Sequence, residues 1–399
     1  MSPNSNACEV LIVGGGPAGL ALAISLGQAG IPSTVLEQAP LASLAAPSED
    51  GRDIALTHRA RRILTELGVW DRLPADCVAP LRRAEVRDGS SPWALPFDAS
   101  ATGHEALGWL VPNHLIREAC YAVACASPLV RIVGDARVVN LRRDADAAVV
   151  ETMSAGVSGE HRAALVVAAD SRYSSLRRLA GIGAQMLDFG RTAIVCRMAH
   201  DRPHEGIAHE GFRYGNTLAM LPMAGLQSSA VLTVRGNDAP GWLALPDEAF
   251  AERIAEQFGH RLGAMRCAGA RHAYPLVATY AHRLAEARFA LIGDAAVGMH
   301  PVTAHGYNFG LYGIERLAAT LRRARQDGRD LGDAGLLRAW AAEHRRATWP
   351  IYLGTNAIVR LFTDDRTPAR LLRSAVLRVA GGLPPLKAAV TRQLTGQAA

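Results

Sequence analysis

The chain has 399 residues, of which 49% are hydrophobic and 20% are charged, and its formal net charge is +6. This length predicts two joined domains rather than one small core. The six cysteines include no C-x-x-C pair, which argues against a metal site, and no basic run is interleaved with aromatic residues, which argues against nucleic-acid binding.

The first predicted unit is a strand, a glycine-rich turn and a helix. Residues 10–13 are apolar, glycines spaced as G-x-G-x-x-G follow, and residues 20–29 are predicted to form a helix. Such a turn lets the backbone approach a pyrophosphate, and an acidic residue about 20 positions later accepts hydrogen bonds from a ribose. The residues of this predicted dinucleotide site are Gly14, Gly16, Pro17, Ala18, Gly19 and Glu37.

Farther along, the pattern changes to consecutive strands. A helix is expected at residues 113–126, with Asn113 at its start. The segments that follow with strand patterns separated by turn residues include 191–199, 212–221 and 229–234. A run of this kind predicts antiparallel sheet, unlike the alternating strands and helices on either side of it.

The stretch 288–311 is predicted to contain a buried strand, a loop and a helix start. Residues 289–292 are apolar, and Gly293-Asp294 follow, so one carboxylate lies at the end of the strand. A helix is expected to begin near Gly306, and its free N–H groups favour an electron-rich group in front of it. A carboxylate that accepts from hydroxyls, close to donors for an anionic ring edge, suits a reduced flavin.

Three motifs stand in the order in which they occur in the FAD-dependent aromatic hydroxylases of the para-hydroxybenzoate hydroxylase fold, and the chain resembles this family. They are the glycine-rich turn with Glu37, the D-S-R-Y-S-S-L-R segment at 170–177, which is similar to the family's D-G motif, and Gly293-Asp294. In the second motif Ser171 replaces glycine, so we expect a backbone there that avoids the conformations only glycine reaches easily.

Over nearly the whole chain, the closer resemblance is to the ubiquinone-biosynthesis hydroxylases. It is carried by residues 54–59, by the L-A-M-L-P segment at 218–222 and by the H-P and G-Y-N-F-G-L segments within 298–311. The last of these looks most like the branch that hydroxylates 5-demethoxyubiquinol. Val297 and His305 depart from the commoner family pattern.

The resemblance implies FAD as the cofactor, with NAD(P)H as a candidate electron donor. In this comparison Asp294 would hold the ribityl chain, and Arg117 would reach the FAD phosphates. A solvated surface position for Arg52 and a structural turn cap for Asp170 stand as alternatives. The implied flavin contacts are Arg52, Asn113, Arg117, Asp170, Gly293, Asp294, Gly306, Tyr307 and Asn308.

The implied reaction is monooxygenation of an aromatic or quinol substrate, expected to carry a polyprenyl chain, by O2 through a flavin C4a-hydroperoxide. The catalytic candidates are His300, Pro301 and His305. A loop histidine titrates near neutrality and can take the proton of a ring hydroxyl, and Pro301 would shape the ring face. A hydrogen-bonded structural role is the alternative for each histidine. A hydroxylase of a small phenolic metabolite and a flavoprotein reductase without oxygen insertion also stay open.

We therefore expect a mixed α/β (α+β) fold in three parts. The expected parts are a Rossmann-like FAD-binding domain (1–75, 105–185 and 275–330), an inserted antiparallel-sheet substrate domain (76–104 and 186–274) and a helical C-terminal region (331–399). Residues 218–222 and the strands around Val195 and Leu232 are expected to line a largely apolar substrate side.

The C-terminal region is basic and partly apolar. Residues 360–399 carry seven basic and two acidic side chains. A basic amphipathic helix can rest on an anionic membrane or on a partner in a biosynthetic complex, and packing on the FAD-binding domain is the alternative. No signal peptide is recognisable at residues 1–9, so we expect a cytoplasmic protein, with a peripheral position at the inner face of the membrane as a further candidate.

Overall fold

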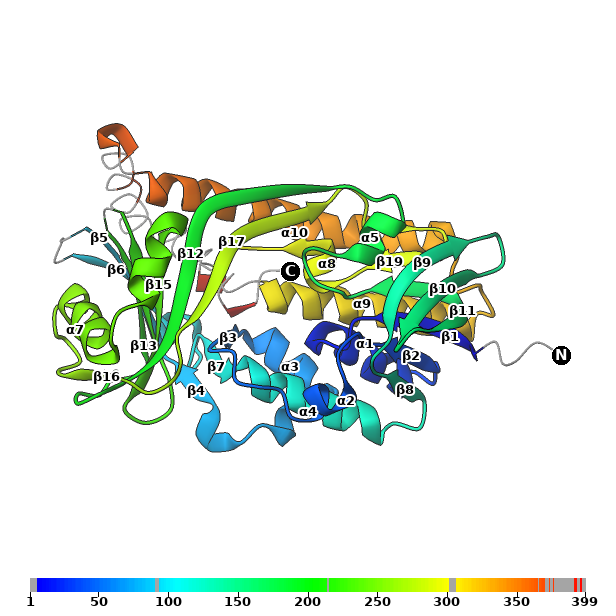
Figure 1. Cartoon of the computed structure of the whole chain (residues 1–399), viewed down its shortest axis with the longest axis horizontal. Coiled ribbons are helices and arrows are strands. Elements are labelled where there is room, and N and C mark those ends of the chain that lie inside the picture. The colour runs from blue at the N-terminus through cyan, green and yellow to red at the C-terminus, as the bar shows by residue number, and fades with distance from the viewer. Residues whose placement is uncertain are drawn as a thin grey trace.

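The computed structural model describes residues 6–89, 93–213, 215–300 and 306–364, together with 366–369, 373, 376, 391, 392, 395 and 396. Within these residues the chain forms a mixed α/β fold, as expected from the sequence. Figure 1 shows a mainly parallel sheet and an antiparallel sheet at opposite ends of an elongated molecule.

The first sheet has the strand order β18-β19-β11-β1-β2-β8, and β9 and β10 extend it from β11. Its strands are β1 (Asn6–Val13), β2 (Ser33–Leu36), β8 (Val130–Val133), β9 (Arg137–Arg143), β10 (Ala148–Ser154), β11 (Val157–Ala168), β18 (Ala285–Glu286) and β19 (Phe289–Leu291). β1 is parallel to both β11 and β2. Its inner residues are fully buried, as expected for a parallel strand covered on both faces.

The second sheet has the strand order β20-β17-β12-β15-β14-β13-β5-β6, and β16 pairs with β12. Its strands are β5 (Arg83–Asp88), β6 (Ala94–Asp98), β12 (Ala184–His200), β13 (Ile207–Phe212), β14 (Thr217–Pro222), β15 (Gln227–Arg235), β16 (Met265–Cys267), β17 (His272–Ala281) and β20 (Val297–Gly298). The long antiparallel pair β12 and β17 connects the two ends of the molecule (Figure 1). β20 then leads directly toward the expected catalytic loop.

A small third sheet and the helices complete the fold. The sheet consists of β3 (Asp53–Leu56), β7 (Gly108–Pro112) and β4 (Ala79–Leu81). The helices are α1 (Pro17–Gln28), α2 (Leu41–Ala45), α3 (His58–Glu66), α4 (Asn113–Ala126), α5 (Ser175–Leu179), α6 (Ala239–Leu243), α7 (Asp247–Phe258), α8 (Gly293–Ala296), α9 (Gly306–Gln326) and α10 (Ala334–Thr363). Short 3-10 turns are η1 (Trp70–Arg72), η2 (Ala75–Cys77), η3 (Ala99–Thr102) and η4 (Gly236–Asp238).

The two faces of the antiparallel sheet have different neighbours. On one face, Ile194, Leu218 and Leu232 pack with Phe250 and Ile254 of α7 in a closed apolar core. Figure 1 shows α7 on the outer side of this sheet, away from the parallel sheet. Leu218 and Leu232 themselves point toward α7, because side chains alternate along a strand. That residues 218–222 and the strands around Val195 and Leu232 line the substrate side stays a prediction. The face of Val195 points the other way.

Two long helices run through the centre and along one side of the molecule. α9 begins beside α8, and α10 spans the length between the two sheets with Pro350 inside it (Figure 1). Across the described residues, neither these helices nor any other is long and apolar enough to cross a membrane. The division into three parts at the boundaries expected from the sequence stays a prediction.

Candidate active site

The turn between β1 and α1 has room for a ligand at only one of its three spaced glycines. A Cβ built on Gly14 would lie 2.4 Å from the carbonyl oxygen of Ala169, and one built on Gly19 would lie 2.0 Å from that of Gly14. Around Gly16, in contrast, no described atom lies within 4 Å of such a Cβ. This open space lies at the start of α1, where the first N–H groups have no partner within the helix. The turn therefore fits a pyrophosphate.

Glu37 follows β2 directly and lies beside this turn. Its Oε2 accepts a hydrogen bond from the N–H of Gly15 at 2.6 Å, and its Oε1 accepts one from the N–H of Ala39 at 2.9 Å. These two bonds fix the carboxylate, and each oxygen keeps a second lone pair for a hydroxyl donor. The arrangement is compatible with the expected ribose contact, which stays a prediction.

The second expected segment lies against the first. Gly293 follows β19 by two residues and has a positive φ of 55°. A Cβ built on Gly293 would lie 3.0 Å from the Cβ of Ala18, and one built on Gly310 would lie 3.6 Å from the Cα of Gly293. α8 is therefore sandwiched between the start of α1 and the first turns of α9. Segments about 280 residues apart in sequence meet here, as the parallel order of β1, β11 and β19 requires.

Asp294 is held by Arg172, for which the sequence analysis predicted no role. Nη2 of Arg172 lies 2.9 Å from Oδ2 of Asp294, and Nη1 of Arg172 donates to the carbonyl oxygen of Val277 at 2.9 Å. Arg177, which is 3% exposed, donates to the carbonyl oxygens of Ala295 and Arg172 at 2.9 and 3.2 Å. These two arginines join the D-S-R-Y-S-S-L-R segment to the Gly293-Asp294 segment. Their place in the D-G-like motif was the available signal.

Ser171 adopts the backbone conformation that the sequence led us not to expect. Its φ is +83°, in the left-handed region that favours glycine. The carbonyl oxygen of Ser171 accepts a hydrogen bond from the N–H of Ser174 at 3.1 Å, which closes the turn before α5. The turn geometry thus prevails over the preference of serine, at a cost of about 1–2 kcal/mol.

Asp170 caps the short helix α5. Its Oδ1 accepts a hydrogen bond from Oγ of Ser174 at 2.5 Å, and its Oδ2 accepts one from the N–H of Leu176 at 3.0 Å. Both oxygens therefore have structural partners, which agrees with the turn-cap alternative. A contact between Asp170 and the cofactor stays a prediction.

Arg52 and Asn113 share one carboxylate, that of Asp50. Nη2 of Arg52 and Nδ2 of Asn113 lie 2.6 and 2.7 Å from Oδ2 of Asp50, and the hydroxyl of Tyr274 donates to its carbonyl oxygen at 2.6 Å. Burial alone would raise the pKa of Asp50, but the hydrogen bonds and charge of Arg52, with the amide of Asn113, lower this pKa. The cluster stays charged and connects α4, the segment before β3, and β17.

The start of α9 is fastened through a side-chain amide. Oδ1 of Asn308 accepts a hydrogen bond from the N–H of Thr57 at 3.1 Å, and its Nδ2 donates to the carbonyl oxygen of Ala55 at 2.8 Å. The hydroxyl of Tyr307 is buried beside the thiol of Cys120, and burial raises its pKa well above the usual value. No described atom lies within 4 Å of a Cβ built on Gly306. The backbone at this helix start thus has open space in front of it.

His300 is the one catalytic candidate within the described residues, since Pro301 and His305 lie outside them. Its side chain is 7% exposed, and its ring stands edge-on to Phe189 at 4.9 Å between centroids. Burial, with the charge of Arg172, lowers its pKa to about 4. The expected near-neutral titration is therefore wrong, because the ring is desolvated. Any part of His300 in catalysis stays a prediction.

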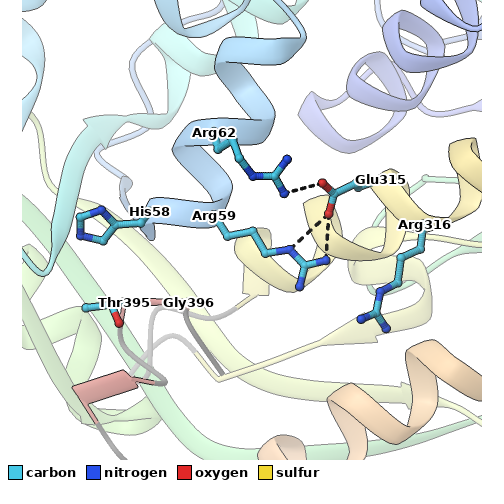
Figure 2. A pocket seen from close by; sticks show the side chains of 7 residues that line it. All are labelled: His58, Arg59, Arg62, Glu315, Arg316, Thr395 and Gly396. Atoms are coloured by element: carbon cyan, nitrogen blue, oxygen red, sulfur yellow. Dashed lines mark hydrogen bonds and ion pairs between the residues drawn. The ribbon is translucent and has the colours of Figure 1, made fainter. Parts of the chain in front are cut away.

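A cavity of about 540 Å³ lies between α3 and α9, next to Thr57. Figure 2 shows Arg59 and Arg62 of α3 facing Glu315 of α9, with Thr395 near the end of the chain on the other side. Nη2 of Arg59 and Nη2 of Arg62 lie 2.8 and 2.6 Å from the carboxylate oxygens of Glu315. The cavity contains none of the residues expected from the sequence. Arg117 is half-buried on α4, and its expected contact with the FAD phosphates stays a prediction.

Two acidic residues of the site region escaped the sequence analysis. Asp53, at the start of β3, has a side chain that is 2% exposed and lies 3.8 Å from Nη2 of Arg197, and burial raises its pKa to about 6. Glu210 lies on β13, just before the segment for which a strand was expected. The available signal was alternation, because an extended strand puts this acid on the same face as Phe212.

The fold and the site define a class: a flavin-dependent hydroxylase whose dinucleotide turn, carboxylate loop and helix start come from separate parts of the chain. The model of the FAD binding domain family matches residues 7–351. Ubiquinone hydroxylase UbiM of Neisseria meningitidis is 42% identical over 97% of this chain and 84% of its own length. Ubiquinone hydroxylase UbiL of Rhodospirillum rubrum is 39% identical over 97% and 89%.

The chain belongs to the FAD binding domain family and, within it, to the ubiquinone hydroxylases. Among solved structures, p-nitrophenol 4-monooxygenase PnpA from Pseudomonas putida superposes with a TM-score of 0.77 at 19% identity, over 98% of both chains. That likeness shows the fold alone. Family membership confirms the expected fold, the FAD cofactor and the class of enzyme, an FAD-dependent aromatic hydroxylase.

Proposed function

We propose that the protein hydroxylates the aromatic ring of a ubiquinone precursor similar to 5-demethoxyubiquinol. The observation that carries this proposal is the meeting of α1, α8 and α9 at Gly293, in a chain 42% identical to a ubiquinone hydroxylase. The substrate is an aromatic quinol, expected to carry a polyprenyl chain, and O2 is the second substrate. NAD(P)H remains the candidate electron donor.

The adenosine half of FAD is assigned to the first turn. We infer that the backbone from Gly14 to Gly19, including Pro17 and Ala18, holds the pyrophosphate at the open N-terminus of α1. Glu37 holds the ribose through the lone pairs that Gly15 and Ala39 leave free. Arg117 adds positive charge toward the phosphates.

The flavin half is assigned to the second segment. Asp294, oriented by its ion pair with Arg172, accepts hydrogen bonds from the ribityl hydroxyls, and Gly293 allows the close approach. The N–H groups at the start of α9, from Gly306 to Asn308, favour negative charge on the ring edge. Arg52 and Asn113, joined through Asp50, hold the opposite side.

When bound, FAD supplies the activated oxygen that an electron-rich ring accepts. The protein positions that ring and excludes water from it. His300 stays neutral at working pH because its pKa is about 4, so it can donate or accept a hydrogen bond without adding charge. His300 is proposed to border the ring face; the same role is expected of Pro301 and His305, which lie outside the described residues.

The test is product analysis after turnover in isotope-labelled O2. FAD-loaded protein is given short-chain 5-demethoxyubiquinol and NADPH or NADH. One labelled oxygen atom in the quinol product supports the proposal. Oxidation of the nicotinamide without label in the quinol identifies a reductase, and labelled product from small phenols alone identifies a phenol hydroxylase. Either of these results overturns the proposal.

We also propose a peripheral contact between the basic C-terminal region and an anionic membrane surface, which would bring the enzyme to a prenylated substrate. The support is the excess of basic over acidic side chains in residues 360–399. Arg373 does not contribute, since it is fully buried and lies 2.8 Å from Asp88. Co-sedimentation with phosphatidylglycerol vesicles, and none with phosphatidylcholine vesicles, is the expected result. Equal absence from both contradicts it.

A further inference from the structure

One row of side chains crosses the face of the antiparallel sheet that points away from α7. The pairing registers align β5 with β13, β13 with β14, β14 with β15, β15 with β12, and β12 with β17. Residues that are directly paired point to the same side of a sheet. The resulting row is Val86, Glu210, Ala219, Val231, Val195 and His272.

Glu210 is the one carboxylate in this row, and its surroundings are apolar. Val86 and Ala219 flank it across the strands, and Ala208 and Phe212 share its face along β13. Phe212 packs on Phe362 of α10, with ring centroids 4.4 Å apart. Glu210 itself is half-buried, and no hydrogen bond or ion pair of its carboxylate occurs among the described residues. Its carboxylate therefore lacks a structural partner there.

Other charged groups near β13 contact partners other than Glu210. On the α7 face, Nδ1 of His209 lies 3.4 Å from Glu85, which also pairs with Arg87 at 2.9 Å, and Arg261 lies 3.3 Å from His209. β14 contains no titratable side chain.

Charged residues whose strand positions share the face of Glu210 also have partners. Asp88 lies 2.8 Å from Arg373, and Arg197 lies 3.0 Å from Glu49 and 3.8 Å from Asp53. Arg191 donates to the carbonyl oxygens of Gly215 and Thr363 at 2.7 and 2.9 Å.

Burial makes the Glu210 carboxyl a weaker acid than an exposed glutamic acid. It raises the pKa of this carboxyl to about 7, and no neighbouring charge shifts it further. A carboxyl in an apolar setting with a pKa near working pH can exchange a proton during turnover. The raised pKa agrees with the position of Glu210 among apolar side chains of the row.

The opposite end of the row lies at the proposed flavin side. A Cβ built on Gly51 would lie 2.7 Å from Cδ2 of His272, and Gly51 is flanked by Asp50 and Arg52 of the cluster described above. Four strand spacings separate Glu210 from His272, which is about 19 Å. Ala219, Val231 and Val195 lie between them. Their side chains are short and apolar, and the inference below places the substrate ring against them.

An apolar cluster lies on each side of the row. Leu221 packs with Leu110 and Met223 under the small sheet of β3, β7 and β4. Phe212 packs with Leu95 and Phe362 under the end of α10. Glu210 lies between these two clusters on the strand register. A ring placed against Ala219 would therefore have one edge toward this carboxylate.

We propose that Glu210 is a catalytic residue that accepts the proton of the substrate's ring hydroxyl. This inference rests on the proposed function. The O–H bond of the phenol or quinol breaks, an O–H bond forms on the Glu210 carboxylate, and the electron pair remains on the substrate oxygen. That oxygen donates electron density into the ring, which makes the ring carbon more nucleophilic toward the oxygen atom that it accepts. The proton leaves Glu210 to water when the product departs.

The first test measures the protonation of the Glu210 carboxyl in the absence of turnover. Infrared difference spectra of the FAD-loaded, substrate-free protein are recorded between about pH 5 and 9. In the wild type, a protonated-carboxyl band is lost with a midpoint near pH 7, separate from the loss near pH 6 that is expected of Asp53. Glu210→Gln removes this band. The matched control Glu160→Gln, on an exposed part of β11, retains it. Survival of the band in Glu210→Gln overturns the assignment.

The second test measures how the rate of hydroxylation depends on pH and on Glu210. With short-chain 5-demethoxyubiquinol, kcat/KM of the wild type rises with pH through about 7. Glu210→Gln lacks this rise and lowers kcat by about 100-fold, while its FAD content and KM remain close to those of the wild type. Glu210→Asp keeps the rise and part of the activity. Full kcat in Glu210→Gln, with the wild type active, overturns this inference alone. A wild type that forms no labelled product overturns the proposed function, and the inference with it.

Discussion

Replacement of Gly16 by alanine is expected to weaken cofactor binding alone, whereas replacement of Gly19 by alanine is expected to reduce folding stability as well. At Gly19 the new Cβ would lie 2.0 Å from the carbonyl oxygen of Gly14, more than 1 Å inside normal contact. Backbone must move at the centre of the fold, at a cost of about 3 kcal/mol or more. At Gly16 no described atom is within 4 Å, and φ is −72°, so alanine fits the chain. Its methyl group instead occupies the space where the pyrophosphate is expected.

Gly16→Ala is therefore expected to change the unfolding free energy by less than about 1 kcal/mol, because the lost backbone freedom of the unfolded chain offsets a weaker helix N-cap. Its FAD affinity falls at least tenfold, or about 1.4 kcal/mol. Gly19→Ala loses both stability and FAD. Circular dichroism of the apoprotein during heating measures the first quantity, and quenching of FAD fluorescence measures the second.

Two results would refute this reasoning. A folded Gly16→Ala protein with wild-type FAD affinity means that the open space at α1 does not receive the cofactor. A Gly19→Ala protein with wild-type stability means that the short approach to Gly14 is relieved without cost.

Three further results are expected. Ser171→Gly stabilises the protein by about 0.5–1 kcal/mol in chemical denaturation, because relief at positive φ exceeds the greater freedom of unfolded glycine; destabilisation would contradict this. Arg172→Met changes stability by less than about 1 kcal/mol, since the ion pair is partly exposed, yet weakens FAD binding because Asp294 loses its orientation; unchanged FAD affinity counts against the role of Asp294. Burial lowers the pKa of His300 and of His344 to about 4, so the unfolded chain binds protons that the folded chain does not, and stability rises from about pH 4 to 6.5. His344→Gln should flatten that rise in denaturation midpoints measured against pH.

Local sequence was enough to predict the first part of the site. The order of an apolar strand, spaced glycines and a helix depends on neighbouring residues, because backbone freedom at Gly14 and helix formation after Pro17 are short-range effects. The same holds for Gly293 after β19. Strand–turn–helix units therefore formed where the pattern placed them.

Predictions that depended on which way a side chain points, or on which residues it contacts, were less successful. Residues 218–222 were expected to line the substrate side, but the pattern did not show which of them face it; Leu218 points toward α7, since a shift of one residue along a strand reverses the face. Ser171 was expected to avoid the left-handed region, yet a turn closed by Ser174 holds it there. His300 was expected to titrate near neutrality, but neighbours distant in sequence bury it. The residues that bury His300 and the position of α7 are not visible in the local pattern, whereas Ser174 lies in the same segment as Ser171.

The sequence by itself determined the elements, the dinucleotide turn and the family resemblance, because these depend on periodicity, glycine placement and residue order. Only the tertiary structure decided which residues meet. It joined Arg172 to Asp294, 122 positions away, and aligned Glu210 with Ala219 and Val231 on one face. Strand register and burial are set by packing over the whole chain. For that reason the buried carboxylate became recognisable only once the sheet was assembled.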